Sequence, residues 1–141
     1  EFDACFRFNV TTALAMTRLV VPLMAKTAGS GAIVNISSVA GRFNARGFAA
    51  YGTAKAALSF LTRSLAQDFA PKVRVNAIAP GVINTPRPGG EAPGRPGPGA
   101  LEHVALRRLG TADDVAGVAL FLASDAAAFI SSSVVDVNGG E

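Results

Sequence analysis

The sequence has very few of the side chains from which disulfides and metal centres are built. Its 141 residues include one cysteine, Cys5, and one histidine, His103. A single thiol cannot form an internal disulfide and suits a reducing compartment, so we expect a cytoplasmic location. One histidine and one cysteine leave almost no ligands for a conventional His/Cys metal site, and we expect no bound metal.

Charged residues are sparse, and long uninterrupted apolar runs are absent. Asp, Glu, Lys and Arg make up 16% of the chain and hydrophobic residues 50%, with a net charge of +3. The basic residues are scattered and form no stripe, which argues against a nucleic-acid partner. No consecutive apolar run approaches the roughly 18 residues of a membrane span, so we expect no membrane partner. Length and composition suit one globular domain with a substantial core.

The hydrophobic pattern alternates between helical and strand-like segments. It predicts helices over residues 6–26, 48–69 and 115–124, and buried strands over 32–36, 73–78 and 133–137. The third helix follows Thr111-Ala-Asp-Asp114, which has the form of a capping box. Buried strands that alternate with helices indicate an α/β fold. We expect about three strands of a parallel sheet with flanking helices, as part of a doubly wound, Rossmann-like sheet.

Tyr51 and Lys55 stand four positions apart in the predicted helix 48–69. Residues at this spacing share one helix face, so the ammonium group can lie near the phenol oxygen. A fixed cation favours a phenolate and moves the pKa of a phenol from about 10 toward the working pH, which makes the phenol usable as an acid or base. Taken alone, the pair more often indicates a surface helix pair that has no chemical role.

Two serines follow the predicted strand 32–36. Ser37 and Ser38 stand at its carboxyl end, where open α/β sheets bind their ligands. A hydroxyl group there can meet the same substrate oxygen as Tyr51. Both residues offer the same chemical group, so chemistry alone leaves open which one acts.

Five motifs occur in one order at familiar spacings. They are Gly31-Ala-Ile-Val-Asn-Ile-Ser-Ser38, Gly41, Tyr51-x-x-x-Lys55, Val73-Arg-Val-Asn-Ala-Ile-Ala-Pro-Gly81 and Val137-Asn-Gly-Gly140. Together they resemble the short-chain dehydrogenase/reductase family, of the type that includes ketoacyl reductases and hydroxysteroid dehydrogenases. The resemblance covers almost the whole chain. It implies hydride transfer between a nicotinamide cofactor, NAD or NADP, and a ketone or secondary alcohol.

The resemblance also implies catalytic roles for four residues. Tyr51 exchanges a proton with the substrate oxygen, and Lys55 assists it and holds the nicotinamide ribose. The family spacing to the tyrosine selects Ser38 to bind the reacting oxygen, with Ser37 as its structural neighbour. Asn9 matches an asparagine that helps to hold a relay water. From its own context, a solvated or locally bonded asparagine is the alternative.

Further implications concern the cofactor, the substrate and assembly. By resemblance, Pro80, Gly81, Ile83 and Thr85 pass along the nicotinamide, although an ordinary turn is the alternative for these residues alone. The partner is then a small-molecule carbonyl or alcohol substrate. The family forms homo-oligomers through the two long helices, so we expect a dimer or tetramer.

The glycine-rich strand-to-helix turn that binds a dinucleotide pyrophosphate is missing from this sequence. The glycine-rich segment 86–99 follows no predicted strand and has proline or glycine at ten of fourteen positions. We therefore expect residues 1–141 to be the C-terminal catalytic portion of a Rossmann-type domain whose dinucleotide-binding portion is absent. Segment 86–99 would be a flexible substrate-covering loop.

Two other functions compete with this interpretation. The chain as it stands can be a truncated, non-catalytic fragment that folds by self-association and binds no cofactor. An acyl hydrolase that uses Ser38 is disfavoured, because no Gly-x-Ser-x-Gly elbow surrounds this serine and the only histidine, His103, follows the glycine-rich segment.

Overall fold

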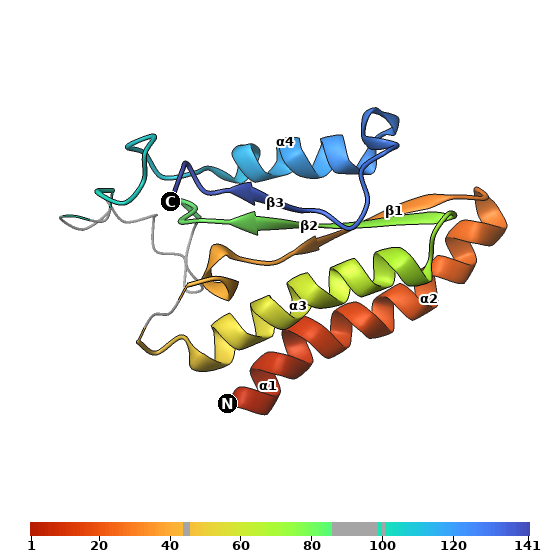
Figure 1. Ribbon diagram of the computed structural model, residues 1–141, viewed down its shortest axis with the longest axis horizontal. Helices are drawn as coiled ribbons and strands as arrows, with labels where there is room; N and C mark the ends of the chain where they lie inside the picture. The colour runs from red at the N-terminus through yellow and green to blue at the C-terminus, as the bar shows by residue number, and fades with distance from the viewer. Residues whose placement is uncertain (44–45, 86–98, 100) are drawn as a thin grey trace.

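The computed structural model describes residues 1–43, 46–85, 99 and 101–141. In chain order, the elements are α1 (Phe2–Phe6), the π-helical turn η1 (Arg7–Thr11), α2 (Thr12–Thr27), β1 (Gly31–Ile36), the 3-10 turn η2 (Val39–Gly41), α3 (Ala49–Asp68), β2 (Val73–Pro80), α4 (Ala112–Ala123), the 3-10 turn η3 (Asp125–Ala127) and β3 (Val134–Val137). Figure 1 shows α1, η1 and α2 as one continuous helix beside α3.

The three strands form one parallel sheet in the order β1-β2-β3. Gly31 is level with Val73 and Ile36 with Ile78 along β1 and β2, while Ala77 is level with Val134 along β2 and β3. Each connection between these strands carries a helix, which is the arrangement that parallel strands require. All three strands therefore end at the same edge of the sheet. The predicted α/β fold with a three-stranded parallel sheet is confirmed.

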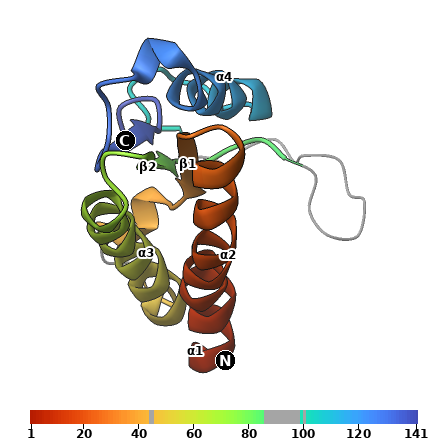
Figure 2. The same ribbon diagram turned by 90° about the vertical axis from the view of Figure 1, so that its right-hand side faces the viewer.

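Helices cover both faces of the sheet. Figure 2 shows α2 and α3 on one face and α4 on the other. Side chains of β2 alternate between the two layers, as strand geometry dictates. Val73 and Val75 belong to a core cluster with Leu65 of α3, and Ile78 packs with Leu122 of α4. Because both faces of β2 are covered, almost the whole strand is buried. This burial explains the apolar run from which the strand was predicted.

Element boundaries differ from the predictions by a few residues. The N-terminal helix begins four residues earlier than the predicted 6–26, α4 begins three residues before the predicted 115–124, and β2 continues two residues beyond the predicted 73–78. The capping box of α4 is confirmed: the Thr111 hydroxyl accepts from the Asp114 N–H, and the Asp114 carboxylate accepts from the Thr111 N–H. The predicted substrate-covering loop, 86–99, lies outside the described residues except for Gly99.

The N-terminal helix bears on the expectation that the chain has no membrane partner. The run Phe2–Thr27 is 26 residues long and is long and apolar enough to cross a membrane, judged by length and composition alone. It is the one such helix in the part of the chain that the structure describes. The count of consecutive apolar residues missed it, because polar residues such as Arg7 and Arg18 interrupt the run. Core helices of globular proteins that meet the same criterion are mostly buried, whereas 6% of the apolar window of this helix is buried. Leu14 and Val21 of the helix pack against the sheet core.

Candidate active site

Tyr51 and Lys55 lie one turn apart on the first half of α3. The Lys55 ammonium nitrogen is 5.6 Å from the centroid of the Tyr51 ring, and the Phe48 ring meets Tyr51 edge-on at a centroid distance of 6.1 Å. Tyr51 is 39% exposed, whereas Lys55 is only 9% exposed. The helix therefore offers an accessible phenol with a buried cation beneath it, as the four-residue spacing predicts.

The burial of Lys55 shapes its charge. Its Nζ donates a hydrogen bond of 2.7 Å to the Ile36 carbonyl at the end of β1. Loss of water around the ammonium lowers the pKa of Lys55 below its ordinary value, and an electrostatic contribution from the nearby Cys5 side chain opposes this shift. Cys5 stands on α1, so the N-terminal helix approaches the candidate site. Nothing in the sequence pattern indicated this proximity.

Ser37 and Ser38 have different environments. The Ser37 side chain is buried, donates to the Lys55 carbonyl (2.9 Å) and shares a 2.6 Å hydrogen bond with the Ser59 hydroxyl. Ser38 is half-buried, and its Oγ accepts a 3.2 Å hydrogen bond from the Ala40 N–H at the start of η2. Ser37 is thus tied to the interior of α3, while Ser38 stands at the carboxyl end of the sheet.

Two glycines allow η2 to lie directly against α3. A Cβ added at Gly41 would be 2.8 Å from the backbone nitrogen of Ala56, and one added at Gly52 would be 2.8 Å from the Ala40 carbonyl oxygen. Both distances are too short for real carbon contacts. The absence of a side chain at both positions brings the Ser38 turn to the helix that carries Tyr51.

Asn9 lies in the π-helical turn η1, which contacts α3. Its Nδ2 donates to the Cys5 carbonyl (2.9 Å) and approaches the Cys5 sulfur at 3.5 Å. The asparagine is therefore locally bonded within its own helix, which was the alternative that its context left open. Single π-turns inside α-helices frequently occur at functional sites.

The four predicted nicotinamide residues follow one another from the end of β2. Pro80 is the last residue of that strand, and the Gly81 N–H donates to the Val137 carbonyl (3.0 Å). Ile83 forms an isolated parallel bridge with Gly110, and Thr85 is exposed. The structure thus brings this segment to the same sheet edge as Ser38.

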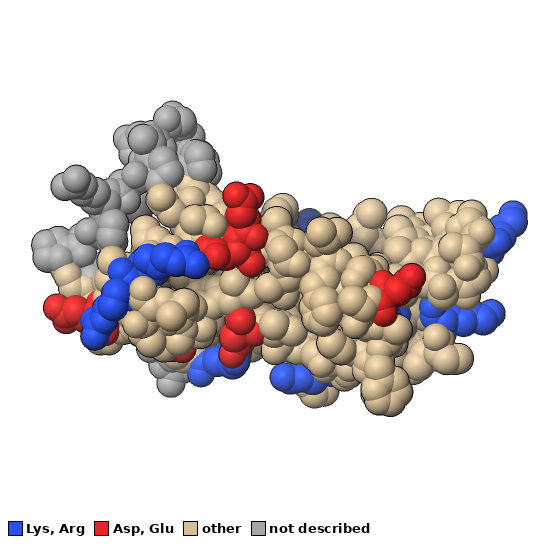
Figure 3. All heavy atoms as spheres, turned by 90° about the horizontal axis from the view of Figure 1, so that it is seen from above, with Lys and Arg blue, Asp and Glu red and all other residues tan. Residues whose placement is uncertain are grey.

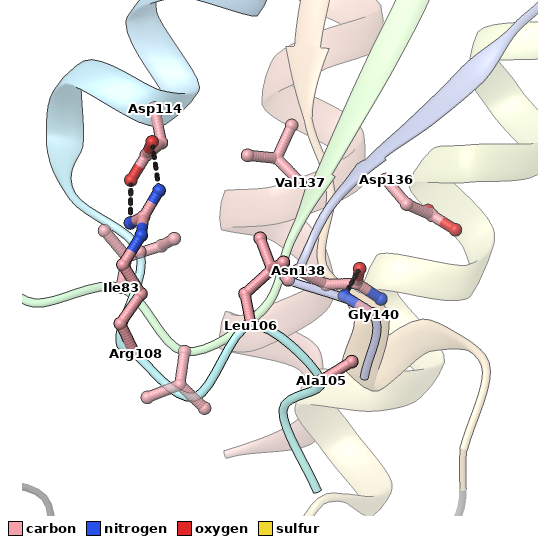
Figure 4. Close-up of a pocket in the computed structure, with 12 residues that line it drawn as sticks. Ile83, Ala105, Leu106, Arg108, Asp114, Asp136, Val137, Asn138 and Gly140 are labelled. Carbon is pink, nitrogen blue, oxygen red and sulfur yellow. Dashed lines mark hydrogen bonds and ion pairs between the residues drawn. The ribbon is translucent and has the colours of Figure 1, made fainter. Parts of the chain in front are cut away.

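A cavity of about 400 Å³ opens beside this segment, between the ends of β2 and β3 and the start of α4. Figure 4 shows Ile83, Leu106 and Val137 pointing into it, with the paired side chains of Arg108 and Asp114 at one side. The Arg108 guanidinium donates two hydrogen bonds, of 2.7 and 2.9 Å, to Asp114. This guanidinium, with Thr111 assisting, holds the pKa of Asp114 well below its usual range.

The sequence analysis missed most of the residues that line this cavity. Of the predicted site residues, Ile83 alone lines it. Val82 neighbours Ile83 after β2, and Asp114 lies in α4. The other lining residues come from the segment before α4 and from β3 and the residues that follow it, including Ala105, Leu106, Asn138 and Gly140. The Val137-Asn-Gly-Gly140 motif was a signal for the second group. No signal marked Leu106.

An ion pair between Arg42 and Asp136 also went unpredicted. The Nη1 of Arg42 contacts the Oδ2 of Asp136, and the Nη2 of Arg42 contacts its Oδ1. The two residues are 94 positions apart, so no local pattern could reveal the contact. Figure 3 shows the molecule from above relative to Figure 1. On that face the charged side chains form small groups, some with blue and red in contact, and there is no continuous basic stripe.

Comparison with known proteins identifies the family. A family model described as enoyl-(acyl carrier protein) reductase matches residues 1–141. The chain is 50% identical to an uncharacterized oxidoreductase of Mycobacterium tuberculosis over 96% of this chain and 52% of that protein. It is 37% identical to the 3-oxoacyl-(acyl-carrier-protein) reductase of Thermotoga maritima, over 99% of this chain and 56% of that protein.

Solved structures agree with these relatives. A 7α-hydroxysteroid dehydrogenase complexed with NADH and 7-oxo glycochenodeoxycholic acid superposes with a TM-score of 0.88 at 36% identity, over 99% of this chain and 55% of that one. The chain spans about half the length of the curated relatives it matches. Together with the match along all 141 residues, these similarities show that the chain belongs to the short-chain dehydrogenase/reductase family of oxidoreductases.

Proposed function

We propose that this chain provides the proton-transfer part of an NAD- or NADP-dependent oxidoreductase that interconverts a ketone and a secondary alcohol. The observation that carries the proposal is the meeting of Tyr51, Lys55 and the Ser38 turn at the carboxyl end of β1. Open α/β sheets bind their ligands at this edge. A structural relative carries NADH in its complex, which supports a nicotinamide cofactor for this family.

Each residue takes the role that the family resemblance implies. A bound nicotinamide would supply or accept the hydride at the substrate carbon. In reduction, the exposed Tyr51 hydroxyl gives its proton to the oxygen that becomes the alcohol, and in oxidation Tyr51 takes it back. The Lys55 ammonium stabilises the phenolate that remains. The Ser38 hydroxyl donates to the reacting oxygen, and Asn9 helps to position a relay water.

The residues present fit only part of a nicotinamide dinucleotide. Lys55 and the segment formed by Pro80, Gly81, Ile83 and Thr85 would hold the nicotinamide and its ribose. The sequence contains no glycine-rich strand-to-helix turn for the pyrophosphate. We infer that residues 1–141 act as the catalytic portion of a Rossmann-type domain, and that another segment or chain completes the dinucleotide site.

We also infer a homo-oligomer in the cytoplasm. Apolar side chains with more than half of their surface exposed line the two long helices, including Met16, Leu19 and Leu23 on α2 and Phe60 on α3. Several large exposed apolar side chains on two helices that cover the same sheet face favour an interaction site. A second copy of this chain is the occupant that we propose, forming a dimer or tetramer.

Cofactor titration tests the proposed function. Two preparations are compared: the 141-residue chain, and an extended version that carries the unmatched part of the M. tuberculosis relative at its N-terminus. Each is titrated with NADH and NADPH, and binding is followed by nicotinamide fluorescence. Intact mass is measured in parallel. We expect saturable binding by the extended version. Absence of binding in both preparations would favour a non-catalytic fragment that folds by self-association.

The variant Tyr51→Phe tests the chemistry in the same extended version. It removes the phenol hydroxyl and retains the ring that packs against Phe48. Because general acid catalysis contributes about 10²–10⁴-fold, we expect turnover of a ketone substrate to be lost while NADH affinity and thermal unfolding change little. Activity above about a tenth of the parent would contradict the role of Tyr51 as the acid that supplies this contribution.

A further inference from the structure

The ion pair between Arg42 and Asp136 crosses the end of the central strand. Arg42 directly follows η2, the turn that Ser38 begins, and Asp136 lies in β3. The sheet order is β1-β2-β3, so these two segments are not neighbours. The Arg42 side chain must therefore reach over the carboxyl end of β2, where Pro80 and Gly81 lead out of the sheet. Asp136 is one of the residues that line the 400 Å³ cavity, and Figure 4 shows its carboxylate on the opposite side of β3 from the Val137 side chain.

The Ser38 turn is held at its other side by α3. The Gly41 N–H donates to the Ser38 carbonyl (3.1 Å), and the Arg42 N–H donates to the Val39 carbonyl (2.9 Å). Gly41 and Ala40 lie directly against the α3 backbone. These contacts order the turn itself and seat it on the helix that carries Tyr51. The ion pair adds an attachment to β3.

The geometry of the pair favours orientation over global stability. The side chains of Arg42 and Asp136 are 50% and 40% exposed, and pairs this exposed contribute little to the stability of a whole protein. Two guanidinium nitrogens contact two different carboxylate oxygens, however, and such a fork fixes direction as well as distance. Because Asp136 occupies the Arg42 fork, Arg42 is not offered to a substrate anion.

We propose that Arg42 and Asp136 are positioning residues of the candidate active site. Their ion pair fastens the far end of the Ser38 turn to β3 and so fixes the Ser38 hydroxyl relative to Tyr51. The proposal rests on the proposed function insofar as Ser38 binds the reacting oxygen. It adds two residues whose effect on the reaction passes through Ser38 and not through direct contact with substrate or cofactor.

Amide hydrogen exchange of the 141-residue chain tests the fastening without any requirement for activity. We expect Asp136→Asn and Arg42→Lys to increase exchange at Ala40, Gly41 and Arg42 about fivefold, which is the effect of losing a well-formed exposed pair. The exchanged pair, Arg42→Asp with Asp136→Arg, should restore much of the protection. The matched control is Arg108→Lys, which disrupts the Arg108–Asp114 fork on the α4 side and should leave exchange in the Ser38 turn unchanged. Unchanged exchange in Asp136→Asn and Arg42→Lys, or an equal increase in the control, would overturn the proposal.

A double-mutant cycle in the extended version tests the effect on the reaction. We expect Asp136→Asn to lower kcat about tenfold without weakening NADH binding, and to have little further effect when Ser38→Ala is already present, because residues that act through one another are not additive. If the reduction in kcat of the double variant equals the product of the reductions in the two single variants, Asp136 does not act through Ser38. A merely structural pair would lower the unfolding temperature and leave kcat unchanged.

The two experiments separate this proposal from the proposed function. If the extended version binds a nicotinamide and turns over substrate, but amide exchange and kcat do not change when the Arg42–Asp136 pair is disrupted, only the positioning proposal fails. If no preparation binds a nicotinamide while exchange responds as expected, the proposed function fails and the fastening of the turn stands.

Discussion

Ser37 and Ser38 are adjacent in sequence and chemically alike, yet the fold gives them opposite surroundings. Ser37 is buried and bonded to α3, whereas Ser38 is half-buried at the end of the sheet. The same substitution at the two positions therefore separates structure from chemistry. Removing a buried hydroxyl leaves its partners unsatisfied, which costs about 1–3 kcal/mol.

We expect Ser37→Ala to lower the free energy of unfolding by about 1–3 kcal/mol. We expect Ser38→Ala to change stability by less than about 1 kcal/mol and to reduce turnover of the extended version on the order of 10²-fold, the loss typical of a donor to the reacting oxygen. Urea unfolding and steady-state kinetics measure the two effects. Ser38→Ala with full activity would remove this residue from the mechanism.

Lys55 makes the stability of the chain depend on alkaline pH. Burial lowers its pKa, so the folded chain releases the Lys55 proton at a lower pH than the unfolded chain, whose lysine titrates near 10.4. Stability rises with pH wherever the unfolded state holds more protons. Below the lowered pKa, the buried ammonium reduces the free energy of unfolding by its full amount. This reduction becomes smaller as the pH rises toward about 10.4, because the folded chain has then released the Lys55 proton.

We expect the unfolding free energy of the parent chain to rise relative to that of Lys55→Met as the pH is raised from the lowered pKa of Lys55 toward about 10.4, the pKa of an unfolded lysine. Urea unfolding at several pH values measures the difference. Lys26→Met, which removes an exposed lysine from the last turn of α2, is the control and should show the same rise as the parent. A constant difference between parent and Lys55→Met across this range would contradict the effect of burial.

At the scale of elements, the contact between η2 and α3 depends on a missing side chain. Gly52 lies within α3, where glycine is unfavourable for helix stability, and a Cβ there would be 2.8 Å from the Ala40 carbonyl oxygen. Gly117 lies within α4, and a Cβ there would meet nothing within 4 Å. The two glycines have the same local setting and differ only in what lies opposite.

We expect Gly117→Ala to stabilise the chain by about 0.5–1 kcal/mol, because alanine is the better helix former. Gly52→Ala should instead destabilise it by about 1–3 kcal/mol, since backbone must move to accept the methyl group. Urea unfolding of both variants measures the contrast. Stabilisation by Gly52→Ala would show that η2 does not lie against α3 in solution.

At the scale of the whole molecule, the layer formed by α2 and α3 covers one sheet face (Figure 2). Several large apolar side chains of these two helices are exposed. Leu19 is 66% exposed and Phe60 68% exposed. Strand β1 pairs only with β2 among the described residues, so its outer edge is a second unsatisfied surface. Both features favour association with another copy or segment.

We expect the chain to sediment as a dimer or tetramer, and Leu19→Glu to shift it toward monomer at micromolar concentration by placing a charge in the proposed interface. Leu120→Glu on α4 is the matched control, because Leu120 is 74% exposed but lies on the opposite sheet face. A folded monomer for the parent chain in sedimentation or light scattering would contradict self-association. Dissociation by Leu120→Glu alone would place the interface on α4.

Local rules account for the parts of the fold that were predicted correctly. Apolar periodicity located the helices and strands, because each pattern repeats within a few residues and reports which face is buried. The capping box of Thr111 and Asp114 was readable because its partners are three residues apart. The Tyr51 and Lys55 pair was readable for the same reason, since one helix turn brings them together.

Tertiary structure decided which distant groups share the site. The pairing of β1, β2 and β3 brings Arg42 to Asp136, 94 residues away, and packing of α1 on α3 brings Cys5 near Lys55. The different fates of Ser37 and Ser38 also depend on where α3 lies. By itself, the sequence determined the elements and the family and indicated the candidate site residues, because these patterns are encoded at short spacing. The fastening of the Ser38 turn and the cavity beside Ile83 depend on sheet order and helix packing, which no local spacing encodes.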